Sequence, residues 1–331
     1  MTKVQRVLLS IRPEIPLKNY LLNLTNKQDR KECGVYVHNL HSIIQDIWRQ
    51  ILAAKGDDVP WQTIIEKLGI HPQGFYAYKN GKKGISILML YKLLRIWQKN
   101  CKKSTEEFDD KWAECYHREV LFGSHKGGYT RLPKSVTPRL SYLIGWICGD
   151  GNFGSYGNHY LIKISEKCTR QLKEVLIPLI EKIFCIKPKF YHIFEGGYAL
   201  HVNSKPLFRF FQQVLKVKVG KIPAIVLSFD STNKAYFLAG IFDSEGYVSK
   251  NRYLITISQS SKKFLVTLLH IFNELGIAMN GPIIHKTKLG TWYTIYSDKK
   301  REIKRFAEVV NSYHVEKQIK LQHMLAKMEI V

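Results

Sequence analysis

One internal repeat constrains the fold of this chain more than any other feature. The apolar segment LIGWICGDG (143–151) ends on Asp150 and a glycine, and LAGIFDSEG (238–246) ends in the same way on Glu245. The sequence that follows each segment also aligns with its counterpart, with shifts of a few positions. A chain that repeats one unit in this way predicts two similar halves related by a pseudo-twofold axis.

The elements expected in each half follow one order. NHYLIKISEK and NRYLITISQS alternate apolar and polar residues, as half-buried strands do, and an amphipathic helical pattern follows each of them. We expect strands at 158–167, 188–194, 198–204, 251–260, 282–288 and 291–297, and helices at 169–184, at 261–276 and at the end of each half. The order α-β-β-α-β-β-α, twice, predicts an α+β fold with halves at 138–220 and 221–331.

Small residues lie at helical spacing in both apolar segments. Gly145 and Gly149 are four positions apart, as are Gly240 and Ser244, so each pair lies on one face of its helix. Small side chains let two helix backbones approach closely, and each segment is the natural partner of the other. Side-by-side packing would bring the two terminal carboxylates to the same end of the helix pair.

Such an arrangement of acids is unfavourable without a counterion. A carboxylate at a helix C-terminus is disfavoured by about 0.3–1 kcal/mol, and two adjacent carboxylates repel each other. Gly151 and Gly246 suit the left-handed turn that often ends a helix, which accounts for the glycines but not for the acids. Divalent cations would relieve both penalties, because Mg²⁺ binds carboxylates together with phosphate oxygens. With a nucleic acid as partner, the pattern points to metal-assisted phosphodiester hydrolysis.

The charge balance indicates a polyanionic partner. Lys and Arg number 51 against 27 acids, a net charge of +24, as in proteins that bind DNA, RNA or an anionic membrane. No apolar run of about 18 residues is present, and the N-terminus, MTKVQRVLLSIRPEIP, lacks a secretory signal. Six scattered cysteines predict reduced thiols. We expect no membrane partner, and a location in the cytoplasm of a prokaryote, archaea included, or in an organelle.

The doubled motif and the αββαββα duplication resemble the LAGLIDADG homing endonucleases over roughly residues 131–330. The resemblance implies two saddle-shaped antiparallel sheets astride the DNA major groove, with active sites where the two signature helices meet. It implies a monomer that cuts a long double-stranded DNA site with Mg²⁺ or Mn²⁺, about two or three ions for the pair of sites. The metal site carried over by position consists of Asp150, Glu245, Gly149 and Ser244.

The resemblance also assigns catalytic roles outside the signature helices. Family members carry a polar residue at the end of the second strand of each half, a position held here by Glu166 and Gln259. The acid at Glu166 departs from the commoner Gln-like residue. A lysine that enters the third helix is thought to act on the water network or the transition state, and it falls on Lys205 and Lys300. Lys299 is adjacent to Lys300, and the sequence does not decide between them.

Base contacts should come from strand residues that point away from the helices. Isoleucines at alternate positions of 158–167 and 251–260 are expected to face the core, so the intervening residues face DNA. We expect about half of these residues to contact phosphates rather than bases. The residues predicted in this way to bind DNA are Tyr156, Lys163, Ser165, Lys250, Arg252, Thr256 and Ser258. The resemblance adds a basic residue four positions after Glu166 and Gln259, which falls on Arg170 and Lys263.

Residues 1–122 predict a mostly helical N-terminal domain. Three helical segments within about 60–98, the first of which ends at Gly69, resemble the helix-turn-helix of Cro-type repressors. An ordinary small helical domain can show the same pattern and stays an alternative. The Gly-, Pro- and Lys-rich segment 123–137 is expected to be a linker. The residues that would face the DNA groove are Gln73, Tyr76 and Lys79.

The preferred function is a site-specific, Mg²⁺-dependent double-strand DNA endonuclease. One alternative is a transcription regulator that kept the fold and lost cleavage, which suits the helix-turn-helix-like segment. Another is an RNA maturase that assists splicing of its own intron, with intron RNA as its partner. Acids at both helix ends favour the enzyme, since a pure binder has no use for them. The chain ends in MEIV without a terminal His-Asn pair, so we expect a free-standing or intron-encoded enzyme rather than an intein.

Overall fold

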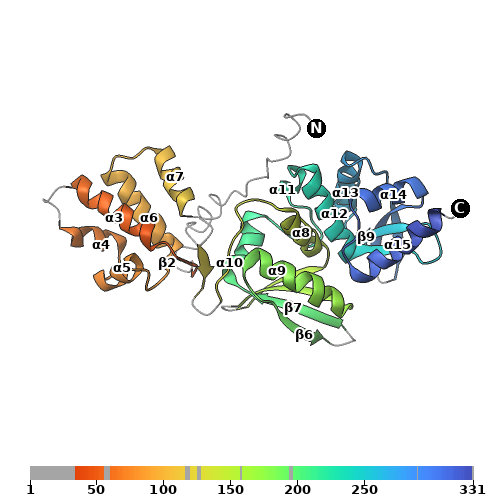
Figure 1. Ribbon diagram of the computed structural model, residues 1–331, viewed down its shortest axis with the longest axis horizontal. Helices are drawn as coiled ribbons and strands as arrows, with labels where there is room; N and C mark the ends of the chain where they lie inside the picture. Colours follow the sequence, from red (N-terminus) through yellow and green to blue (C-terminus); the bar gives the residue numbers. More distant parts are fainter. Residues whose placement is uncertain are drawn as a thin grey trace.

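The computed structural model describes residues 34–55, 60–115, 120–124, 128–156, 159–193, 197–288 and 290–329. Figure 1 shows an N-terminal helical domain followed by two α+β halves. The predicted duplicated αββαββα fold is confirmed, because each half contains one four-stranded antiparallel sheet with its helices in the predicted order. The segment considered as a secretory signal, and Cys33, lie outside the described residues. No described helix is both long and apolar enough to cross a membrane.

The first half starts with the apolar helix α8 and continues directly into its sheet. The sheet has the strand order β4-β5-β7-β6, and alternate residues such as Ile162 and Ile164 are buried against the helices. Its elements are α8 (Pro138–Asp150), β4 (Gly151–Tyr156), β5 (His159–Glu166), η1 (Gln171–Leu176), α9 (Ile177–Phe184), β6 (Lys189–Ile193), β7 (Gly197–Asn203), α10 (Lys205–Arg209) and η3 (Phe210–Val214).

The helix predicted at 169–184 is divided into two parts. Its first turns, η1, are π-helical, and the amide of Ile177 donates to the carbonyl of Leu172. Pro178 follows at the start of α9. Because proline has no N–H and its ring crowds the carbonyl four residues earlier, the wider π turn accommodates it where a regular α turn would not.

The second half repeats this arrangement in the order β10-β11-β9-β8. The strand expected at 251–260 begins only at Ile255, because the amides of Asn251 and Arg252 both approach the Ser249 hydroxyl in a turn. The elements are α11 (Ala224–Leu227), α12 (Ser231–Glu245), β8 (Gly246–Val248), β9 (Ile255–Gln259), α13 (Lys262–Glu274), β10 (Asn280–Thr287), β11 (Gly290–Ser297), α14 (Lys300–Val309) and a further helix, α15 (Val315–Glu329).

The helices α8 and α12 pack along each other, as their small residues predict. A Cβ atom added to Gly145 would collide with the carbonyl oxygen of Phe237, and one added to Gly240 would collide with that of Tyr142. Any larger residue at these two positions would therefore push the helices apart. The Ser141 hydroxyl donates to the carbonyl of Asn233 across the same interface.

The predicted left-handed turns at Gly151 and Gly246 are wrong. Both residues have extended backbones, with φ of −72° and −85°, and each leads from its helix straight into a strand. Glycine is required for space instead. A Cβ atom on Gly151 would lie 2.5 Å from the carbonyl oxygen of Ile147, and one on Gly246 would collide with the Phe242 backbone.

The N-terminal domain is mostly helical, as expected, and a small sheet of order β2-β1-β3 closes it. Gly69 ends the helix α4 in the left-handed conformation, with φ of 70°, so that α5 can begin three residues later. The elements are β1 (Tyr36–His38), α3 (His41–Lys55), α4 (Trp61–Leu68), α5 (Pro72–Lys79), β2 (Ile85–Ser86), α6 (Ile87–Asn100), α7 (Thr105–Glu114) and β3 (Leu121–Gly123).

The segment expected as a linker is partly packed against the first half. Thr130 pairs with Phe122 of β3 and donates its hydroxyl to the carbonyl of Phe184. Thr130 and Val136 are both fully buried. The described part of this segment is therefore integrated into the structure and is not a free tether.

Candidate active site and nucleic-acid interface

The two predicted carboxylates lie at the same end of the helix pair. Asp150 is the last residue of α8, and Glu245 is the last residue of α12. Burial, followed by the negative charge of Asp150, raises the pKa of Glu245 to about 7. Asp150 is exposed at the surface, yet the desolvation of its carboxylate and the charge of Glu166 raise its pKa as well. The site therefore concentrates negative charge in surroundings that oppose it.

Gln259 holds the second of these carboxylates. Its side-chain amide donates to Glu245 Oε1 over 2.6 Å, while its own Oε1 accepts from the backbone amide of Ser260 over 3.0 Å. Since Gln259 ends β9, the sheet of the second half fixes the orientation of Glu245. In this half, the polar residue at the end of the second strand therefore contacts the carboxylate at the helix end, near the predicted site.

Glu166 is engaged differently at the equivalent strand end. Its carboxylate accepts from the amides of Lys167 (2.6 Å) and Cys168 (3.0 Å) and pairs with His314 Nε2 at 3.5 Å. Burial acts to raise the pKa of Glu166, but the hydrogen bonds from His314 and from these amides outweigh it and lower the pKa. Glu166 thus remains charged beside Asp150. No hydrogen bond or ion pair to the Asp150 carboxylate occurs within the described ranges.

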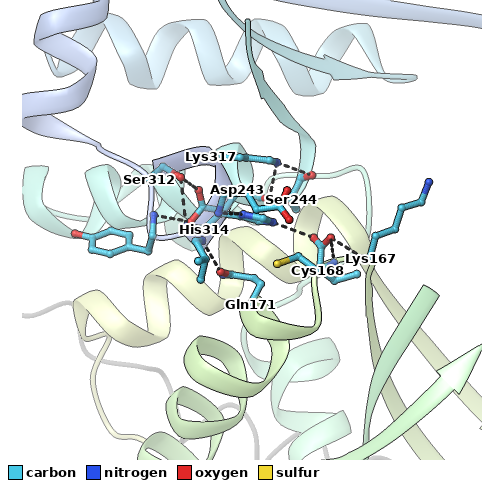
Figure 2. A network of polar contacts seen from close by, with 12 residues as sticks. Lys167, Cys168, Gln171, Asp243, Ser244, Ser312, His314 and Lys317 are labelled. Atoms are coloured by element: carbon cyan, nitrogen blue, oxygen red, sulfur yellow. Dashed lines mark hydrogen bonds and ion pairs between the residues drawn. The ribbon is translucent and has the colours of Figure 1, made fainter. Parts of the chain in front are cut away.

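A network that the sequence analysis missed ties the site to the segment before α15 (Figure 2). The buried carboxylate of Asp243 accepts from the Ser312 hydroxyl (2.5 Å), the Tyr313 amide (2.8 Å) and the Tyr142 hydroxyl (2.8 Å). In the first turn of α15, the ammonium of Lys317 donates to carbonyl oxygens of the last turn of α12. The acid within LAGIFDSEG was a visible signal, whereas residues 312–317 follow the repeat and had no counterpart to reveal them.

The donor set at the helix ends fits a divalent cation that also takes ligands from its substrate. Carboxylate oxygens are hard donors, and Mg²⁺ typically uses one or two of them together with water and phosphate. No group of three or more His, Cys, Asp or Glu side chains in the described part of the chain is arranged to enclose an ion. Gly149 and Ser244 lie together at the helix crossing, where a Cβ atom on Gly149 would collide with the Ser244 hydroxyl.

Lys205 and Lys300 lie against tyrosine rings in the structure. Each ammonium lies over a tyrosine ring, that of Lys205 5.0 Å from the centre of Tyr160 and that of Lys300 4.7 Å from the centre of Tyr253. Tyr160 is six residues from Glu166 along β5, which is about 20 Å in a strand. A catalytic role for either lysine has no support in this arrangement. The matching positions show that Lys300, rather than Lys299, is the counterpart of Lys205.

The predicted base-reading residues lie on the sheet faces that point away from the helices. In the first sheet, Lys163 pairs with His201, and Ser165 lies two positions further on the same face. In the second sheet, Thr256 pairs with Tyr296, and the hydroxyl of Ser258 lies 2.8 Å from that of Thr294. Tyr156 is the most exposed aromatic residue of the described chain, at 88%.

The remaining predicted DNA contacts are exposed but less closely tied to the sheets. Lys250 and Arg252 lie in the turn between β8 and β9. Together with Tyr253 and residues of α15 they line a cavity. Lys263 lies in the first turn of α13. Arg170 already pairs with Glu174 over 3.1 Å, so it is less available for a phosphate.

The N-terminal helix α5 carries the residues predicted to face a groove. Gln73 and Tyr76 are exposed, and the ammonium of Lys79 lies 4.9 Å from the centre of the Tyr76 ring. Phe75 turns inward and packs against Trp48 with ring centres 4.5 Å apart. The helix therefore has one anchored face and one free polar face.

Residues 232–311 match the family model of the LAGLIDADG-like domain. The chain is also 27% identical over 247 residues to a glutamine–fructose-6-phosphate aminotransferase of Methanocaldococcus jannaschii, a match that covers 72% of this chain and 22% of that protein. It is 28% identical over 149 residues to the ATP-dependent DNA helicase Hel308 of the same organism, covering 40% of this chain and 12% of the helicase. The chain thus spans about a fifth or less of the length of these two relatives.

Two solved structures are similar at low identity. The homing endonuclease I-DmoI in complex with DNA and Ca matches with 22% identity and a TM-score of 0.44, over 56% of this chain and 97% of its own. The N-terminal LAGLIDADG domain of DUF199/WhiA matches with 16% identity and a TM-score of 0.39, over 56% of this chain and 86% of its own. Residues 232–311 thus form a LAGLIDADG-like domain, and the first half repeats the αββαββα arrangement of this part of the chain.

Proposed function

We propose that this protein is a site-specific endonuclease that hydrolyses double-stranded DNA with the help of a divalent metal ion. The observation that carries the proposal is the pair of acids at the shared end of α8 and α12, both with raised pKa values. Asp150 lines a cavity of about 610 Å³ beside this end, together with Glu166, Lys317 and Lys320. A protein that only binds DNA gains nothing from concentrating acids next to its polyanionic partner.

Each residue of the site has a distinct part in this proposal. Asp150 and Glu245 would hold Mg²⁺ or Mn²⁺, which when bound supplies charge neutralisation at the phosphate and a more acidic water. Gln259 orients Glu245 through its 2.6 Å hydrogen bond. Since His314 and two backbone amides engage Glu166, the Asp150 carboxylate stays open to the cavity.

The two sheets would supply the DNA-binding surface. The net charge of +24 favours a phosphate backbone. Partly exposed polar residues such as Lys163, Thr256 and Ser258 lie where alternate strand positions can read base edges. Both halves belong to one chain, so a monomer provides both acids and both sheets. The exposed face of α5, with Gln73, Tyr76 and Lys79, would add a second contact in a neighbouring groove.

The two relatives support the view that this chain corresponds to a segment whose activity is independent of the activities in their names. An aminotransferase and a DNA helicase share no substrate or reaction, yet each resembles this chain over a minor part of its length. The simplest common element is an inserted segment with its own activity. Cleavage of a DNA site is an activity that such a segment can have in unrelated hosts.

A transcription regulator is the second candidate, and the geometry of α4 and α5 favours it. The left-handed Gly69 and the exposed polar face of α5 suit a helix that enters a groove. This candidate makes no use of the acids at the helix ends. The basic charge would also suit an RNA maturase, but that function requires no double-stranded DNA site.

A cleavage selection on a randomised DNA library separates these functions. Wild-type protein with Mg²⁺ or Mn²⁺ should enrich one site and cut both strands, whereas Asp150→Asn and Glu245→Gln should bind that site and leave it intact. Tight binding of a site by the wild type, with no cutting under any divalent ion tested, would refute the endonuclease and leave the regulator. Preference for a structured intron RNA would favour the maturase.

A further inference from the structure

A lysine from outside the duplicated fold reaches the carboxylate site. The ammonium of Lys317 donates to the carbonyl oxygens of Phe242 (3.1 Å), Asp243 (2.7 Å) and Ser244 (3.4 Å). These carbonyls belong to the last turn of α12, where helix carbonyls generally lack intrahelical donors, although that of Phe242 also accepts from the amide of Gly246. A cation at this end also interacts favourably with the helix dipole. Lys317 therefore fixes the turn that carries Glu245.

The same ammonium is embedded in a cluster of acids. Burial lowers the pKa of Lys317, and the charges of Asp243, Glu166, Asp150 and Glu245 oppose that effect, in this order of size. Lys317 and Asp150 also line one cavity. A fixed positive charge at this position weakens the attraction of the cluster for any further cation.

Among the described residues of the first half, none of the lysines donates to the last turn of α8 as Lys317 does to that of α12. The carbonyl of Cys148, at the corresponding place near the end of α8, accepts from the backbone amide of Gly220 over 2.8 Å. An amide satisfies the carbonyl but brings no net charge. The end of α12 is thus held by a charged side chain and the end of α8 by a neutral backbone group.

We propose that Lys317 is a positioning residue of the metal site, a proposal that rests on the metal-dependent function above. It holds the last turn of α12 in place beneath Glu245 and keeps its ammonium beside the acids. Its loss should therefore have two opposed effects. Divalent ions bind more tightly because the charge is gone, while cleavage slows because Glu245 is less well held. A purely structural role would weaken both properties together.

The test compares Lys317→Met, which removes the charge and the donors, with Lys317→Arg, which keeps both. Lys327→Met is the matched control, because it removes the same charge about 15 Å further along α15. The dissociation constant for Mn²⁺ is measured by calorimetry without DNA, together with amide hydrogen exchange over residues 240–246. Cleavage of the selected site is measured at saturating Mn²⁺.

For Lys317→Met we expect Mn²⁺ affinity to rise by about tenfold, hydrogen exchange at the end of α12 to accelerate and cleavage to slow by about tenfold or more. Lys317→Arg and Lys327→Met should keep the wild-type affinity to within about twofold. If Lys317→Met does not fold, Lys317→Gln removes the same charge with smaller loss of polarity.

Two outcomes separate this proposal from the function on which it rests. Wild-type protein that binds Mn²⁺ and cuts DNA, with a Lys317→Met affinity that is unchanged or weaker, overturns the role of Lys317 and leaves the nuclease intact. Wild-type protein that binds no Mn²⁺ overturns the metal-dependent function. In that case unchanged hydrogen exchange in Lys317→Met would also refute the anchoring of α12.

Discussion

The two halves of the candidate site have matching acids in different surroundings. Glu245 is held by Gln259 at 2.6 Å, and its helix end is held by Lys317. Asp150 has neither support, and it lies beside Glu166, whose carboxylate is tied to His314 at 3.5 Å. The repeated sequence thus determines where the acids lie. The aligned but different residues Glu166 and Gln259, together with the segment after the repeat, determine how each acid is held and charged.

This difference indicates a division of labour between the halves. Glu245 is oriented before any substrate binds, whereas Asp150 is open to the cavity and can adjust to an incoming ion and phosphate. The tail after α14 creates the difference, because His314 and Lys317 reach one half each from the same short segment. Two symmetric sites would hold both acids in the same way.

The largest expected effect comes from removing either acid. Asp150→Asn and Glu245→Gln should each lower the cleavage rate by roughly 10³-fold, since each removes a proposed ligand of an ion that would supply several kcal/mol of transition-state stabilisation. Affinity for the DNA site, measured without metal, should stay the same or increase, because a negative charge is lost. If one of the two variants cut both strands at the wild-type rate, the two acids would not form one functional pair.

Exchanging the second-strand residues tests whether the halves differ as described. Gln259→Glu should slow cleavage by about 10–100-fold, because it replaces the donor at 2.6 Å with a like charge. Glu166→Gln should have a smaller effect, below about tenfold, since it removes a like charge near Asp150. Single-turnover assays on a supercoiled plasmid resolve nicking of each strand. Equal effects of the two variants would show that the halves work alike.

The raised pKa of Glu245 predicts a pH dependence of stability without divalent ions. Its pKa is about 7 in the folded protein against an ordinary value of 4.5, so between these values the folded state binds more protons than the unfolded state. Stability should therefore fall as pH rises through this window, by on the order of 1–3 kcal/mol. Urea unfolding from pH 4.5 to 8 measures this component. Glu245→Gln should remove it, and Asp150→Asn should shift it to lower pH; an identical profile in all three proteins would contradict the shift.

The features of the fold that occur in both halves of the repeat were predictable from the sequence. The order of elements, the close contact at Gly145 and Gly240, and the common location of Asp150 and Glu245 all follow from patterns that each half confirms in the other. Periodicity and small residues act locally, so they can be recognised without knowing the tertiary structure. The N-terminal helices were predictable for the same reason.

Residues brought in by tertiary folding were not predictable in this way. His314 and Lys317 follow the second half, where no aligned partner marks them, and their role depends on a chain path that crosses both helix ends. Gly151 and Gly246 were misread because a conformational preference and a lack of space favour the same residue type. Only the backbone conformation separates the two causes.

The smallest effect is expected for the lysines that the alignment had placed in the site. Lys205 and Lys300 hold equivalent positions over Tyr160 and Tyr253, and equivalence between halves is not proximity to the acids. Lys205→Met and Lys300→Met should therefore change the cleavage rate at saturating DNA and metal by less than about threefold, with a modest loss of DNA affinity at high salt. Lys317→Met, assayed beside them, should exceed that change at saturating metal. A loss of cleavage of 10²-fold or more in Lys205→Met, with normal DNA affinity, would mean that this lysine reaches the phosphate after DNA binds.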